Sequence, residues 1–286
     1  MPIKQETQLK QPTEALVLSG RVLFSLAIVS LGIETLVCAR TVAYPLSPDY
    51  AGLPVLPWLP AISWLASLFG VIWVACGVGL LTPRWLRIAS VALGSLLVLC
   101  TLILILPKYA MHLGDIGLRT VVFEPLTLAC IAYLLPGDTA LPAWFARLCR
   151  ALIGLALVAF GVDHFLALAF IASLLPAWIP SHVFWVAFFG IALIAAGISI
   201  ALGFFARWSA AGLGLMFGIW VVTLHLPRVM GLYGISGAPH NPDEWSSLFI
   251  ALGLWGGFWA LARDPSRQAC LQPSTAAPLF RPSSRS

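Results

Sequence analysis

Eight long apolar runs follow one another along the chain, separated by short polar segments. A helix needs about 20 apolar residues to cross the hydrocarbon core of a bilayer, and each run is close to that length. The pattern therefore predicts an all-α polytopic membrane protein with eight transmembrane helices. The predicted helices lie near residues 17–39, 60–81, 85–106, 119–136, 147–171, 182–203, 207–226 and 244–263.

The composition agrees with a chain that is solvated by lipid. Only 9% of the residues are charged and 60% are hydrophobic, whereas a soluble domain carries roughly 25% charged residues. The net charge of +5 does not indicate a nucleic-acid partner, because the basic residues are scattered between the apolar runs. The six cysteines form no C-x-x-C pair, so we expect neither a disulfide nor a metal site from them.

The basic residues predict the orientation of the chain in the membrane. Eight helices place both termini on one side, and twelve of the sixteen Lys and Arg residues fall on that side. Cytoplasmic loops carry an excess of Lys and Arg. We therefore expect a multi-pass protein of the inner (plasma) membrane with both termini in the cytoplasm. The four basic residues on the opposite side are Arg40, Lys108, Arg119 and Arg228.

An internal repeat organises the sequence. Shifting the chain by 120 residues aligns residues 58–124 with residues 178–244 without a gap, and a shift of 129 aligns Glu34 with Asp163. Two tandem four-helix units related by a parallel pseudo-twofold axis are therefore predicted. The expected organisation is a cytoplasmic segment (1–16), a first membrane repeat (17–136), a cytoplasmic linker (137–146), a second repeat (147–263) and a disordered cytoplasmic tail (264–286). The matched positions include Trp58 with Trp178, Gly70 with Gly190, Gly77 with Gly197, Arg87 with Arg207, Pro107 with Pro227 and Glu124 with Glu244.

Glycine spacing predicts where helices pack closely. Gly190 and Gly197 share one helix face, as do their counterparts in the first repeat. Gly214 and Gly218 form a G-x-x-x-G, which lets two helix backbones approach each other. His225 lies seven residues beyond Gly218 and is expected on the same packed face.

Histidines and most acids gather toward the side opposite the termini. A charge at mid-membrane costs about 2.5–3.5 kcal/mol on insertion scales, so a carboxyl retained there needs a partner. Packing or an interfacial position explains each of these residues separately, and Glu244 also suits the N-terminus of its helix. The candidate polar site consists of Asp163, His164, His182, His225, Glu244, Glu34 and Glu124.

The two repeats differ in this polar group. Thr35, Ile62 and Ile105 of the first repeat replace the three candidate histidines of the second. The second repeat is therefore the better candidate for a functional site. The sequence contains no phosphate-binding loop, no nucleophile elbow and no H-E-x-x-H, and no metal site is predicted.

The second repeat resembles the DoxX-like family of bacterial four-helix membrane proteins over about 110 residues. The segments that carry the resemblance are F-G-V-D-H-F at 160–165, L-P-A-W-I-P-S-H at 175–182, F-G-I-A-L-I-A-A-G at 189–197, A-R-W-S-A-A at 206–211, L-H-L-P at 224–227 and E-W-S-S at 244–247. The resemblance implies a link to membrane redox complexes, since the namesake of the family is a subunit of a thiosulfate:quinone oxidoreductase. Most members have a single four-helix unit, so a fused pair departs from the family pattern.

Three functions stay open at this point. The first is a redox-associated membrane subunit with a quinone site in the outer half of the second repeat, where quinone is favoured over haem as the cofactor. This function needs a redox partner protein, because the chain has no flavin, iron–sulfur or C-x-x-C motif. The alternatives are a small-solute transporter or channel and a non-catalytic membrane assembly partner. A homo-oligomer also stays open.

Overall fold

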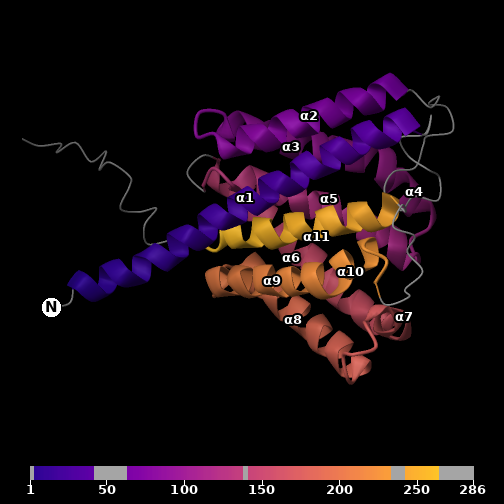
Figure 1. The fold of residues 1–286 in the computed structure, drawn as a ribbon. Coiled ribbons are helices and arrows are strands. Elements are labelled where there is room, and N and C mark those ends of the chain that lie inside the picture. The colour runs from indigo at the N-terminus through magenta and orange to yellow at the C-terminus, as the bar shows by residue number, and fades with distance from the viewer. Residues whose placement is uncertain (1–2, 42–62, 138–140, 233–241, 264–286) are drawn as a thin grey trace, which may run out of the picture.

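The computed structural model describes residues 3–41, 63–137, 141–232 and 242–263, and every regular element within them is a helix (Figure 1). The elements are α1 (Ile3–Thr41), α2 (Ser63–Leu81), α3 (Leu86–Cys100), the π-helix η1 (Thr101–Ile105), α4 (Leu106–Met111), α5 (Ile116–Leu134), α6 (Ala143–Leu166), α7 (Leu168–Leu174), α8 (His182–Leu202), α9 (Ala206–Trp220), the π-helix η3 (Val221–His225), α10 (Leu226–Val229) and α11 (Pro242–Leu261). We call α1–α5 the first unit and α6–α11 the second unit. The expected tail at 264–286 and part of the linker at 137–146 lie outside the described residues.

Six stretches of the described helices are long and apolar enough to cross a membrane. Their length and composition indicate a multi-pass membrane protein. Helix α2 contributes a shorter apolar stretch, Ser67–Leu81, so eight crossings stay a prediction. The six stretches are Glu14–Val37, Leu86–Ile103, Ile116–Leu134, Ala143–Leu166, His182–Leu202 and Ala206–Val229.

One predicted helix is interrupted. The apolar run at 147–171 predicts a single helix, but α6 ends at Leu166 and α7 begins at Leu168. Between them, Ala167 leaves the helical conformation, with φ −110° and ψ 28°. The break carries no glycine or proline, so the hydrophobic pattern contains no signal for it.

The π-helices occupy equivalent positions in the two units. Residues 101–105 and 221–225, which are offset by 120, form η1 and η3 between equivalent α-helices. A proline follows each π-helix, at Pro107 and Pro227. Proline cannot donate a backbone hydrogen bond and clashes with the carbonyl four residues earlier. A π turn, which bonds residue i to i+5, accommodates this loss just before the proline. The local structure therefore follows the sequence repeat.

Close packing of the first two long helices also recurs in both units. Helix α1 packs on α2, and α6 packs on α8. A methyl group added to Gly32 would lie 2.8 Å from the carbonyl oxygen of Gly70, and one added to Gly161 would lie 2.6 Å from that of Gly190. These two contacts join equivalent pairs of glycines, so the helix pairs cross at equivalent points.

The units pack against each other through their first and last helices. Helix α1 of the first unit lies along α11 of the second, and α6 of the second unit lies along α5 of the first (Figure 1). A methyl group on Gly20 would lie 2.6 Å from the carbonyl oxygen of Gly256, so α1 and α11 approach closely. The core that runs through both units is apolar, and its fully buried members include Phe24, Ile28, Leu128, Ile131 and Phe258.

The G-x-x-x-G of α9 does not bring two backbones together, contrary to the expectation from sequence. The indole of Trp259 fills the space beside Gly214, and a methyl group on Gly218 would lie 2.7 Å from Cε2 of Trp255. The glycines make room for two large rings of α11, which is a second way in which small residues allow close helix packing.

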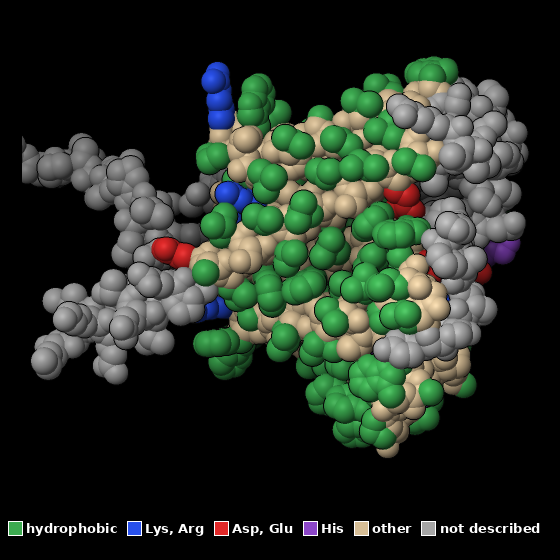
Figure 2. All heavy atoms as spheres, in the orientation of Figure 1, with side chains coloured by type: hydrophobic (Ala, Val, Ile, Leu, Met, Phe, Trp, Pro, Cys, Tyr) green, Lys and Arg blue, Asp and Glu red, His purple; other side chains and the backbone are tan. Residues whose placement is uncertain are grey.

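Charge is distributed unequally between the two ends of the bundle. Helix α1 begins and α11 ends at the same end, which we call the terminal end; the other is the loop end (Figure 1). In Figure 2, blue Lys and Arg side chains gather at the terminal end of the visible face; red acidic side chains lie at the loop end, and a red patch is also visible at the terminal end.

Candidate functional site

Asp163 of α6 forms an ion pair with Arg119 of α5. The Nε of Arg119 donates to Oδ2 of Asp163 at 3.3 Å, and its Nη2 donates to Oδ1. The side chain of Asp163 is only 6% exposed, while that of Arg119 is 23% exposed. A two-point guanidinium–carboxylate pair of this kind compensates the burial of the carboxylate. The pair therefore lets α6 carry an acid and ties the second unit to the first.

Glu34 of α1, the sequence counterpart of Asp163, is also held from the other unit. Ser246 of α11 donates from its hydroxyl to Oε1 of Glu34 at 2.7 Å. Each acid thus lies in the first helix of its unit and bonds a side chain near the start of the last helix of the other unit. The two contacts link the units at the loop end, one at the α1–α11 interface and the other at the α5–α6 interface.

A second ion pair lies within the second unit. Arg228 of α10 donates to both oxygens of Glu244 at the start of α11, with distances of 2.8 Å from Nε to Oε2 and 2.5 Å from Nη2 to Oε1. The sequence counterparts are Lys108 and Glu124. Glu124 is half-buried in α5, whereas the side chain of Lys108 lies outside the described residues.

The imidazole ring of His164 stacks against an aromatic side chain. Its ring is stacked on Trp220 of α9, with centroids 5.8 Å apart and an interplanar angle of 18°. Its Nδ1 lies 2.7 Å from the carbonyl oxygen of Phe160. A carbonyl oxygen only accepts, so Nδ1 carries the proton, and Nε2 of the neutral ring is an acceptor. Thr35, the counterpart of His164, bonds the equivalent carbonyl of Leu31 at 2.8 Å.

An aromatic cluster surrounds this stack in the second unit. Trp220 meets Phe189 edge-on at 5.4 Å and Phe217 at 5.2 Å between ring centroids. The counterparts of Trp220 and Phe217 in the first unit are Cys100 and Leu97. The two units therefore keep the same backbone bond at the His164 position but differ in what faces the side chain.

His225 lies at the end of η3, one π turn beyond Trp220. Arg228 and Glu244 are close enough to act on it electrostatically. Its Nδ1 is buried and has no hydrogen-bond partner among the described residues. A buried polar atom without a partner costs about 1–3 kcal/mol, so a hydrogen-bond partner at this nitrogen would be stabilising.

The other candidates lie apart from this stack. His182 is half-buried at the start of α8, and its Nε2 lies 3.1 Å from the carbonyl oxygen of Pro176, so it donates to its own loop and orders it. His112 is exposed after α4. Three residues predicted for this side, Asp49, His240 and the side chain of Asp243, lie outside the described residues.

Sequence reasoning missed the cations and the serine that hold the acids. It counted Arg119 and Arg228 as orientation signals only. The alignment of Lys108 with Arg228, beside that of Glu124 with Glu244, was a signal for the second ion pair. Ser246 carried no such signal, because its partner is 212 residues away.

Comparison of the chain with known protein families, with curated proteins and with solved structures finds no match. The described residues also contain no group of three His, Cys, Asp or Glu side chains that is able to hold a metal ion. The features of the second unit that bear on function are the His164 stack, the ion pairs and the buried His225.

Proposed function

We propose that this chain is a DoxX-like, redox-associated membrane subunit with a site for a quinone ring at the loop end of the second unit. The observation that carries the proposal is the neutral His164 stacked on Trp220, with its proton committed to the carbonyl of Phe160. In this arrangement Nε2 of His164 accepts a hydrogen bond. A quinol hydroxyl supplies such a donor, and a flat ring suits the aromatic cluster.

The buried Nδ1 of His225 supports the fit of a ring with two oxygens. It lacks a partner among the described residues and lies one π turn beyond Trp220. Nε2 of His164 and Nδ1 of His225 are two ring nitrogens open to a further hydrogen bond, and a quinone carries two oxygens at opposite ends of a planar ring. His164 and His225 would hold the ring and exchange protons at these oxygens.

The ion pairs change the expected role of the acids. Asp163 and Glu244 each bind an arginine at two points. A carboxylate held at two points by a guanidinium has its oxygens occupied by that ion pair. We therefore assign Asp163 and Glu244 to positioning of the helices and assign proton exchange to the histidines.

The redox balance requires a partner. Reduction of a quinone to a quinol takes two electrons and two protons, and its reverse releases them. The chain has no flavin, iron–sulfur or C-x-x-C motif. A redox protein that docks on the membrane face would supply or accept the electrons, while His164 and His225 would exchange the protons.

The packing between the units weighs against a solute path along their shared axis. Leu128 and Ile131 of α5 face Gly253 and Gly257 of α11. The side chains of Phe24 and Phe258 fill the same core and are fully buried. This interface is apolar and closely packed, whereas a carrier needs a polar site there.

The test is quinone retention by the purified full-length protein. The chain is extracted in mild detergent, loaded with a short-chain ubiquinone and washed, and the bound quinone is measured by chromatography. We expect His164→Ala and His225→Ala to lower retention at least fivefold. The matched variants Thr35→Ala and Ile105→Ala change the counterpart positions of the first unit and should retain the wild-type amount.

Three outcomes would overturn the proposal. Equal retention by all four variants would remove the site from the second unit. Protein that holds no quinone but moves a solute across liposomes would be a carrier. Protein that does neither would be an assembly partner.

A further inference from the structure

A pocket of about 530 Å³ lies at the terminal end of the second unit, whereas the histidine stack lies toward the loop end of the same helices. Its walls come from the end of α5, the first half of α6, the α8–α9 connection and the end of α11. No residue of the candidate polar site lines it.

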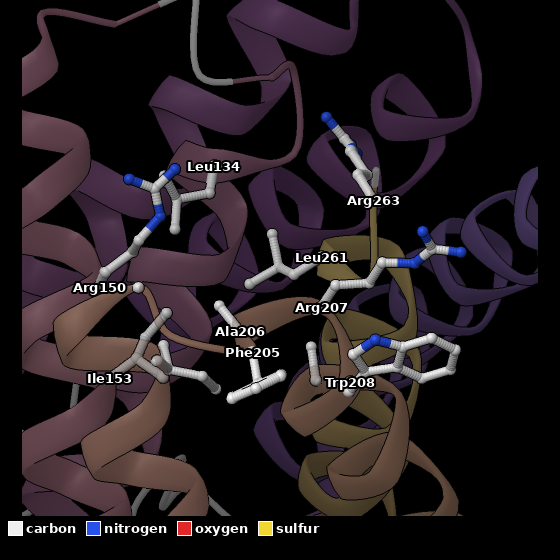
Figure 3. A pocket seen from close by; sticks show the side chains of 12 residues that line it. Leu134, Arg150, Ile153, Phe205, Ala206, Arg207, Trp208, Leu261 and Arg263 are labelled. Carbon is white, nitrogen blue, oxygen red and sulfur yellow. The ribbon is translucent and has the colours of Figure 1, made fainter. Parts of the chain in front are cut away.

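Three arginines line this pocket and come from three different elements (Figure 3). Arg150 lies on α6, Arg207 on the first turn of α9, and Arg263 just after α11. The Nε of Arg263 donates to the carbonyl of Ala260 at 3.0 Å, and its Nη2 donates to the carbonyl of Leu135. These bonds fix the guanidinium of Arg263 at the end of α5.

The start of α9 adds to the positive character of the pocket. Ala206, Arg207 and Trp208, its first three residues, all line the cavity. The N-terminus of a helix carries a partial positive charge and exposed N–H donors, which favour an anion. The guanidinium of Arg207 lies over the ring of Trp208, 5.2 Å from its centroid.

The remaining wall is apolar. Leu134, Ile153, Ile200 and Leu261 line the pocket beside the arginines, and Figure 3 shows Leu261 between Arg263 and Ala206 in the view. A pocket with cationic and apolar lining suits an amphiphile whose anionic head binds arginine and whose chain contacts leucine and isoleucine.

The first unit does not repeat this arrangement. Arg21 and Arg87 correspond to Arg150 and Arg207, but Arg263 lies beyond the aligned segment, which ends at Glu244, and has no counterpart in it. The turn also differs, because Phe205 has a left-handed φ of 52° while its counterpart Trp85 has a φ of −100°. A left-handed backbone is costly for a bulky residue. The second unit therefore supplies all the lining residues of the pocket except Leu134 of α5.

We propose that this pocket binds a phosphate-bearing anion. Arginine presents a planar fork of donors that matches phosphate oxygens. Basic pockets between helices at a membrane face bind the headgroups of anionic lipids. The phosphate comes either from such a lipid or from a soluble phosphorylated compound on the side that the sequence predicts to be cytoplasmic. The proposal is independent of the quinone site.

The test compares the full-length protein with two variants. Arg150→Gln with Arg207→Gln removes two cations and leaves Arg263 in its backbone bonds, and Arg87→Gln, the exposed counterpart in the first unit, is the matched control. Native mass spectrometry counts bound phosphatidylglycerol against phosphatidylcholine, and thermal shifts are recorded with and without inorganic phosphate. Helix content and elution volume show that each variant is folded.

A lipid headgroup would be supported as the bound phosphate if the wild type and Arg87→Gln retain phosphatidylglycerol and the double variant loses at least tenfold of it. If inorganic phosphate raises the melting temperature of the wild type and Arg87→Gln but not of the double variant, the same site is supported, with a soluble phosphorylated compound as the ligand. Equal binding of both probes by all three proteins would overturn the proposal.

Discussion

Ser246 Oγ donates a hydrogen bond to Glu34 Oε1 at 2.7 Å, although 212 residues separate the two in sequence. The contact joins α11 to α1 and mirrors the ion pair that joins Arg119 of α5 to Asp163 of α6. In both cases the acid belongs to the first helix of one unit and its partner to the last helix of the other. The units are therefore linked at two related interfaces. The acid is bound by a neutral serine hydroxyl at one interface and by a charged guanidinium at the other.

Removal of Arg119 should destabilise the protein strongly. The variant Arg119→Leu leaves Asp163, which is 6% exposed, without its cation. Loss of one partner of a buried ion pair costs roughly 3–5 kcal/mol, and the 23% exposure of Arg119 places this variant near the lower value. The melting temperature in detergent should fall clearly below that of the wild type.

The double variant Arg119→Leu with Asp163→Leu is the control for that prediction. It removes both charges, so no charge is left buried, and it should be more stable than Arg119→Leu alone. A double variant that melts below the single variant would show that the pair does more than compensate a buried carboxylate.

Ser246→Ala should have a smaller effect on stability than Arg119→Leu. A hydrogen bond to a charged group contributes about 1.5–3 kcal/mol, and the variant removes a single bond from Glu34. Thermal unfolding of the two variants side by side measures the difference. A melting temperature for Ser246→Ala as low as that of Arg119→Leu would contradict the prediction that the Ser246–Glu34 bond contributes less to stability than the Arg119–Asp163 pair.

Reversal of both charges should rescue the ion pair of the second unit. Arg228→Glu places two carboxylates beside each other, because Glu244 lies within 2.8 Å of the arginine nitrogens. We expect a lower melting temperature for this variant and recovery of more than half of the loss when Glu244→Arg is added. Failure of the second change to restore any stability would mean that the helices, not the pair, set the geometry.

A methyl group on Gly214 should disturb the packing of α9 on α11. The indole of Trp259 occupies the space that the added carbon of Gly214→Ala would need. Overpacking of this kind costs about 1–3 kcal/mol. Gly212→Ala on the same helix is the control, because an added methyl group there would meet no atom within 4 Å. Equal melting temperatures for the two variants would exclude the clash.

Loss of the indole that supports His164 should weaken quinone retention. Trp220→Leu keeps an apolar side chain but removes the ring stacked on His164. Aromatic pairing contributes about 0.5–1.5 kcal/mol beyond buried area, which corresponds to a loss of bound quinone of roughly twofold to twelvefold. Phe188→Leu, at a half-exposed ring that does not contact Trp220 in the described structure, should bind as the wild type does.

Much of the architecture could be predicted from the sequence because it depends on local composition. Apolar runs predicted the helices to within a few residues at most ends, and prolines at equivalent positions account for equivalent π-helices. The spacing of Gly190 and Gly197 and of their counterparts Gly70 and Gly77 predicted close packing, and these glycines do pack α6 on α8 and α1 on α2. The break at Ala167 was missed, since no helix-breaking residue marks it.

Less of the candidate site could be predicted from the sequence. The sequence indicated that buried acids need partners, but the partners of Asp163 and Glu34 come from helices of the other unit. The arginine-lined pocket was missed for the same reason, because its three cations are far apart in sequence and each fits an orientation signal by itself.

The sequence by itself determined that this chain enters a membrane, that its helices fall into two related sets and that the second set carries the three candidate histidines. These features follow from the hydropathy and spacing of neighbouring residues. Only the tertiary structure decided which acids are neutralised by arginine, which ring supports His164 and where a cationic pocket forms. Those properties depend on distances across helix interfaces, and a repeat of 120 residues constrains which helices are alike but not which side chains meet.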